Sequence, residues 1–137
     1  MSTHATGNFE VKGWDEKTWD GKPYSEVPGA KLTHAIVPQT FHGDLEGEGE
    51  VQYLMTYSDI RANFVGLQRV VGRIGKRSGS FVLEVSGTFE NGKISGTWVV
   101  VPGSGTEELR GLKGTLAAVD SPEGSMTIPY AFDYEFE

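Results

Sequence analysis

Residues 45–57 read LEGEGEVQYLMTY, and this stretch decides the fold. Its polar and apolar residues alternate with the period of a β-strand, yet Gly47 and Gly49 occupy positions on the face that also carries Val51 and Tyr53. A strand interior disfavours glycine, which costs backbone entropy and offers no side chain for packing. Glycine inside a strand therefore indicates a tight bend, a bulge or the corner of a barrel.

The same interruption recurs along the chain, which has 19 glycines among its 137 residues. Further strand-like segments contain Gly66, Gly72, Gly79, Gly87, Gly96 and Gly114. Alternation predicts eight strands in all, over residues 8–14, 31–41, 45–57, 62–74, 80–89, 93–101, 113–119 and 125–136. Short turns join them and no long helical segment separates them, which is typical of an antiparallel up-and-down meander. We therefore predict an all-β, eight-stranded barrel, lipocalin-like in shape, with an immunoglobulin-like sandwich as the alternative.

The length favours one domain over residues 1–137. We expect residues 1–6 to be disordered and residues 15–30 to form a long loop, with Trp19 and Tyr24 as candidates for a lid over the barrel mouth. The glycine-rich segment from Pro102 to Thr106 is interpreted as a shaped turn that closes one barrel end.

Composition excludes several classes of function. There is no cysteine, so disulfides, thiolate catalysis and cysteine zinc sites are ruled out. A net charge of -7 disfavours non-specific binding to nucleic acids or anionic membranes. No secretory signal is visible and no apolar run is long enough to span a membrane, so we expect a cytoplasmic protein.

Three stretches carry a resemblance to a known family: FVGLQRV at 64–70, GSFVLE at 79–84 and VPGSGTEELRGL at 101–112. Through them, and over nearly its whole length, the chain resembles the bacterial domain-of-unknown-function family numbered three-two-two-four. That family in turn resembles the allene oxide cyclase-like barrels, which are similar in shape to the lipocalins. The resemblance implies an eight-stranded barrel and implies no activity, because no catalytic residues are established for the family.

The candidate catalytic residues are few: Glu48, Glu84 and Arg69. We predict an apolar pocket inside the barrel that Glu48 or Glu84 reaches. Glu48 belongs to an acidic row with Glu46 and Glu50, and inside the barrel it would be a general acid or base. A solvated outer face is the preferred interpretation, because carboxylates are rarely buried without partners. Arg69 lies in a strand beside apolar neighbours and could pair with Glu48 or Glu84, for a structural purpose or to anchor a ligand carboxylate.

Aromatic residues on the predicted strands are numerous enough to line an apolar pocket. The candidate ligand-binding residues are Tyr53, Phe81, Trp98 and Tyr130. No metal site is predicted, because His4, His34 and His42 are not spaced as a ligand pair on one strand. No cofactor is predicted either.

Three functions fit this reading. The first is a module that binds a small apolar molecule inside the barrel. The second is an isomerase or cyclase that uses a carboxylate in the cavity. The third is a non-catalytic assembly protein with a filled barrel. A homo-oligomer is expected in each case, because strands that are apolar on both faces must cover one of them.

Overall fold

Antiparallel pairing links every strand of the computed structural model to its neighbours, over the described residues 3–23, 31–58, 61–90, 93–118 and 127–137. The strands are β1 (Thr3–Val11), β2 (Asp15–Thr18), β3 (Lys31–Gly43), β4 (Leu45–Tyr57), β5 (Arg61–Ile74), β6 (Arg77–Glu90), β7 (Lys93–Val100), β8 (Leu112–Ala118) and β9 (Thr127–Phe136). Helical structure within these ranges is limited to one 3-10 turn, η2 (Glu107–Leu109). No helix of the described part is long and apolar enough to cross a membrane.

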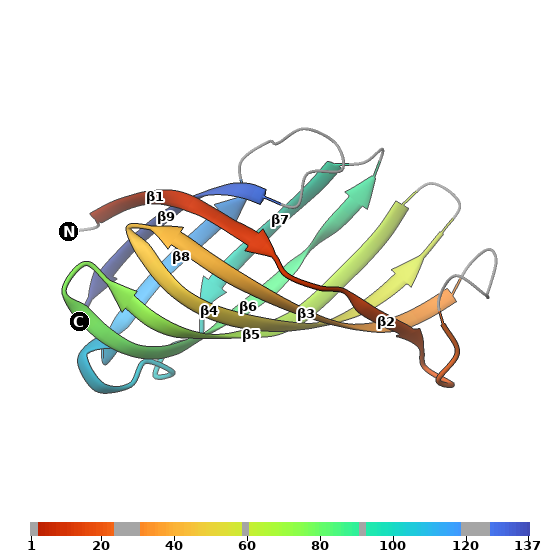
Figure 1. Ribbon diagram of the computed structural model, residues 1–137, viewed down its shortest axis with the longest axis horizontal. Coiled ribbons are helices and arrows are strands. Elements are labelled where there is room, and N and C mark those ends of the chain that lie inside the picture. Colours follow the sequence, from red (N-terminus) through yellow and green to blue (C-terminus); the bar gives the residue numbers. More distant parts are fainter. Residues whose placement is uncertain (1–2, 24–30, 59–60, 91–92, 119–126) are drawn as a thin grey trace.

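Closure of the sheet comes from β1, which pairs with β9 on one side and with β3 on the other. The order β1-β9-β8-β7-β6-β5-β4-β3 thus forms a closed barrel of eight strands, with both termini at one end and β2 at the other (Figure 1). The ninth strand, β2, extends the edge of β3 beyond the point where β1 leaves it. The predicted barrel is confirmed, and the sandwich alternative is wrong.

Pro38 lies at the junction where β1 gives way to β2 along β3. Its carbonyl oxygen accepts a hydrogen bond from the Lys12 backbone N–H at 2.8 Å. In an antiparallel ladder the N–H and C=O of one residue point to the same side. The backbone nitrogen of Pro38, which carries no hydrogen, therefore faces the connection between β1 and β2, where no ladder hydrogen bond is required.

The strand glycines occupy inward-facing positions, alternating with exposed residues and in phase with buried ones. A Cβ on Gly66 would lie 2.2 Å from the carbonyl oxygen of Gln52, and one on Gly72 would lie 2.0 Å from that of Glu46. No side chain fits at these distances. The backbones of β4 and β5 can therefore lie this close together only because Gly66 and Gly72 have no side chain. The glycines thus allow the strong bending that closes a small barrel.

One half of the barrel, at the end that holds both termini, is filled. The fully or nearly fully buried residues there are Phe41, Leu45, Phe81, Leu109, Leu112, Tyr130 and Phe132. The Tyr130 hydroxyl accepts a hydrogen bond from the Leu45 N–H at 3.0 Å and lies 3.1 Å from the carbonyl oxygens of His42 and Leu45. The glycine-rich segment from Pro102 to Thr106 leads into η2, whose Leu109 is fully buried at this end.

Two expectations at the N-terminal side need correction. Residues 3–6 are not disordered, because Thr3–Thr6 pair with Tyr134–Ala131 of β9. The expected loop at 15–30 begins instead with β2, held by its register with β3. Trp19 is largely exposed, and its indole N–H donates to the Thr33 carbonyl oxygen at 3.3 Å. Tyr24, the other lid candidate, lies outside the described residues.

Candidate functional site

The second half of the barrel is hollow, with a cavity of about 430 Å³ at the end opposite the termini. Its walls are the last residues of β1, β4, β6 and β8 and the first residues of β5 and β9, together with residues of β2, β3 and β7. The lining consists of Phe9, Val11, Trp14, Glu16, Gln39, Tyr53, Met55, Tyr57, Ala62, Phe64, Phe89, Trp98, Ala118 and Ile128. It is mainly aromatic and aliphatic, with Glu16 and Gln39 as conspicuous polar groups, which is the composition of a small-molecule site.

Glu16 brings a carboxylate into this apolar cavity. On β2 exposed and buried residues alternate, so Glu16 and Thr18 face inward, and Glu16 is only 7% exposed. Three donors hold the carboxylate: the Trp14 indole N–H at 2.8 Å from Oε1, the Thr33 hydroxyl at 2.6 Å from Oε2, and the Tyr57 hydroxyl, also on Oε2. The side chain is thereby fixed in one orientation.

Aromatic rings form the wall beside this carboxylate. The Tyr53 ring lies edge-on to Phe64, with ring centroids 5.1 Å apart, and is tilted against Trp14 at 6.0 Å. On the far side Phe9 meets Trp98 edge-on at 6.4 Å. Such contacts keep the rings in place and give the cavity a defined shape.

A polar pair separates the hollow half from the filled half. The Gln68 side-chain amide donates to Oε1 of Gln39, and both residues are buried. Oε1 of Gln68 has no hydrogen-bond partner within the described residues. Burial raises the pKa of the neighbouring Tyr53 phenol well above its ordinary value, and a hydrogen bond with Gln39 acts in the opposite direction. Tyr53 is therefore a neutral phenol at physiological pH.

The four predicted ligand-binding residues all face the lumen, yet they divide between its two halves. Tyr53 and Trp98 line the cavity. Phe81 is stacked on Phe132 in the filled half, with ring centroids 6.3 Å apart. The Tyr130 hydroxyl is hydrogen-bonded to the backbone of the turn between β3 and β4. Of these four residues, Tyr53 and Trp98 are therefore the two that a molecule in the cavity would contact.

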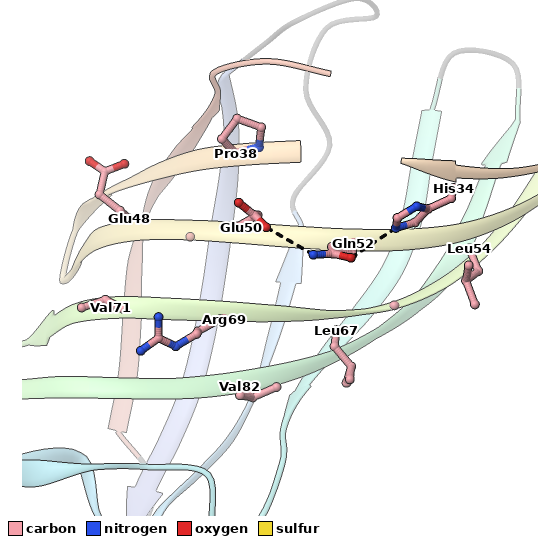
Figure 2. A pocket seen from close by; sticks show the side chains of 12 residues that line it. His34, Pro38, Glu48, Glu50, Gln52, Leu54, Leu67, Arg69, Val71 and Val82 are labelled. Atoms are coloured by element: carbon pink, nitrogen blue, oxygen red, sulfur yellow. Dashed lines mark hydrogen bonds between the residues drawn. The ribbon is translucent and has the colours of Figure 1, made fainter. Parts of the chain in front are cut away.

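The three predicted catalytic residues lie on the outer face of the barrel and are exposed. Figure 2 shows Glu48 and Arg69 beside a groove of about 890 Å³ across β3 to β6, which we name the outer groove. The pairing expected for Arg69 is not formed: Glu48 accepts from the Thr40 hydroxyl at 3.0 Å, and Arg69 has no ion pair in the described part. The expectation that Glu48 or Glu84 reaches a cavity inside the barrel is not met, because both alternate with inward-facing residues.

The three histidines are far apart and each has its own partner. His4 is hydrogen-bonded to Asp133 at 2.6 Å, His34 to Gln52 at 3.2 Å and His42 to Glu10 at 2.7 Å. Across the described ranges no group of three or more potential metal ligands comes together.

Sequence reasoning missed Glu16, the residue that gives the cavity its chemistry. The segment Asp15–Thr18 contains no apolar residue, so hydrophobic periodicity gives no strand signal there. A different pattern could have indicated the strand. Trp14, Glu16 and Thr18 are each two residues apart, so their side chains lie on one side of an extended chain.

Comparisons with known proteins agree with this fold. No curated protein sequence matches the chain. A solved structure of a protein of unknown function from Shewanella oneidensis MR-1, of the DUF3224 family, is similar to it with a TM-score of 0.81 and 32% sequence identity. That alignment covers 100% of this chain and 98% of the other. The model of the family described as "Protein of unknown function (DUF3224)" matches residues 5–134. The chain therefore belongs to the DUF3224 family, the one numbered three-two-two-four, as its sequence motifs predicted.

Proposed function

We propose that this protein binds a small, largely apolar molecule in the hollow half of its barrel. The observation that carries the proposal is the cavity of about 430 Å³, whose lining is mainly aromatic and aliphatic. A volume of this order lies within the range of small-molecule sites, which is roughly 300–1,000 Å³. Removal of an apolar ligand from water into such a cavity is favourable by about 25 cal/mol per Å² of apolar surface.

Two adjacent alanines on β8 provide a matched test. Ala118 lines the cavity, whereas Ala117 is exposed on the outer face. The probe is N-phenyl-1-naphthylamine, a neutral apolar dye whose fluorescence rises in apolar surroundings. We expect one dye molecule per chain, and we expect Ala118→Trp to weaken binding at least roughly tenfold because it fills the cavity, while Ala117→Trp leaves it unchanged. Equal binding by both variants, or no dye binding by the unmodified protein, would contradict the proposal.

A second candidate function is an isomerase or cyclase that uses Glu16, a carboxylate in the cavity. The observation that favours it is the pairing of Glu16 with the Tyr57 hydroxyl, since a carboxylate and a phenol in contact can pass a proton between them. The test is hydrogen–deuterium exchange at the carbon next to the carbonyl of 2-tetralone in heavy water, followed by NMR. Exchange that the protein accelerates and Glu16→Gln abolishes would support catalysis, and an unchanged rate would count against it.

Binding is preferred over the two alternatives. Three of the hydrogen-bonding positions of Glu16 are already taken by donors of the chain itself. The assembly hypothesis requires a barrel that is filled throughout, and the cavity is an argument against it. The cytoplasmic location expected from the sequence stays a prediction.

A further inference from the structure

We propose that the ligand of this cavity is an apolar amine, bound as its ammonium ion to the Glu16 carboxylate and to the aromatic rings around it. The inference rests on the proposed binding function and narrows it to one chemical class.

The first argument is an acceptor position of Glu16 that the chain leaves open. Each oxygen of a carboxylate offers about two lone pairs. Among the described residues, Oε2 accepts from both Thr33 and Tyr57, whereas Oε1 accepts only from Trp14. Since Glu16 lines the cavity, the remaining position on Oε1 is available to a ligand that donates a hydrogen bond.

The second argument is charge. Within the described residues, no lysine, arginine or histidine forms an ion pair with Glu16, although the residue is only 7% exposed. Buried carboxylates are normally paired with a cation, because burial of an unpaired charge is costly. An ammonium ion in the cavity would supply the missing partner, and an N⁺–H···O⁻ hydrogen bond is about twice as strong as a neutral one.

The third argument is the aromatic wall. The rings of Trp14, Tyr53, Tyr57 and Trp98 all line the cavity. The faces of such rings attract cations, and the attraction grows as water is removed. The Tyr57 ring already carries the Lys31 ammonium group, 4.9 Å from its centroid, which leaves the rings of Trp14, Tyr53 and Trp98 for a ligand.

Two other ligand classes compete with an amine. A neutral alcohol could use the open position on Oε1 but would leave the charge without a partner. A carboxylic acid would enter as its anion, which Glu16 in the cavity would repel. The amine is the class that satisfies the open acceptor, the charge and the rings together.

The test compares three probes of nearly equal shape by isothermal titration calorimetry: 4-phenylbutylamine, 4-phenyl-1-butanol and 4-phenylbutanoate. We expect the amine to bind at least roughly tenfold more tightly than the alcohol, and the carboxylate to bind most weakly. Equal affinities, or tighter binding of the alcohol or the carboxylate, would overturn the inference. The proposed function would survive that result as long as the naphthylamine dye binds in the cavity.

Two variants assign the preference to the site. Glu16→Gln keeps an acceptor for Thr33 and Tyr57 but removes the charge, and we expect the amine to lose its advantage over the alcohol. Glu84→Gln removes the same charge from the outer face and serves as the matched control, with no expected change. A preference that persists in Glu16→Gln would refute the role of the carboxylate. If that variant does not fold, the order of the three probes in the unmodified protein still decides.

Discussion

A single hydroxyl group joins the filled half of the barrel to the turn at its end. The Tyr130 hydroxyl hydrogen-bonds the backbone of residues 42–45, where Leu45 is fully buried. Tyr130→Phe would leave the Leu45 N–H without its partner, so we expect a loss of about 1–3 kcal/mol in the free energy of unfolding. Urea denaturation monitored by circular dichroism measures it. Tyr134→Phe, on the same face of β9, is the control and should change stability by well under half as much.

A second residue, Tyr53, links stability to alkaline pH. In the unfolded chain its phenol has the ordinary pKa of about 10. Burial raises the pKa of this phenol in the folded protein. As pH rises above about 10, the unfolded chain therefore loses the phenol proton while the folded protein still holds it. The contribution of Tyr53 to stability is therefore constant below about pH 10 and falls as pH rises through the folded pKa. We expect Tyr53→Phe to flatten this fall. Denaturation curves at pH about 8 and about 11 measure it, and parallel losses in both proteins would contradict the argument.

At the scale of an element, the bend of β5 depends on its inward-facing glycines. A Cβ at Gly66 would lie 2.2 Å from a backbone oxygen of β4, which cannot move without breaking the ladder. Gly66→Ala should therefore destabilise the protein by about 1–3 kcal/mol, the usual range for overpacking. Gly13→Ala is the control, since its Cβ would meet only Pro38 at an ordinary 3.4 Å. Thermal unfolding of both variants checks the prediction, and equal midpoints would contradict it.

At the scale of the whole molecule, the outer face of β4 and β5 carries exposed apolar side chains, and Val99 of β7 lies beyond the exposed Glu84 of β6. The side chains of Leu54, Val65, Leu67, Val71 and Val99 are each between 45% and 57% exposed. Patches of this kind mark interaction surfaces. We propose that a second copy of the chain covers it, because the outer groove, which Leu54, Leu67 and Val71 also line, carries charges of both signs. Glu50 of β4 lies across from Arg69 of β5, and Glu48 lies across from Val71, two residues further along (Figure 2). None of the three charged residues has an ion pair within the described part.

In this dimer we expect Arg69 of each copy to pair with Glu50 of the other, since a two-fold axis makes such a contact reciprocal. Light scattering after size-exclusion chromatography should then show a dimer, and both Arg69→Glu and Glu50→Arg should weaken it through repulsion between like charges. A mixture of the two variants should restore it, because each variant then meets the opposite charge. A monomeric unmodified protein, or no recovery in the mixture, would refute this interface.

The strands were predictable because their signal is local. In β4 and β9 the side chains alternate strictly, so the inner face could be read from the sequence, and the predicted span of β4 was correct at both ends. The outward position of Glu46 and Glu50 followed from the same alternation. The start of β1 and the whole of β2 escaped, because their polar residues pair with β9 and β3, which lie far away in the sequence.

The sequence by itself determined the barrel: alternation set the strands, and glycines at inward positions allowed the curvature that closes them. Only the tertiary structure decided where the barrel is hollow and what chemistry the hollow offers. Glu16 enters the lumen because β2 pairs with β3, and its partners Thr33 and Tyr57 come from two other strands. Such a site depends on contacts between distant residues, which no local pattern encodes.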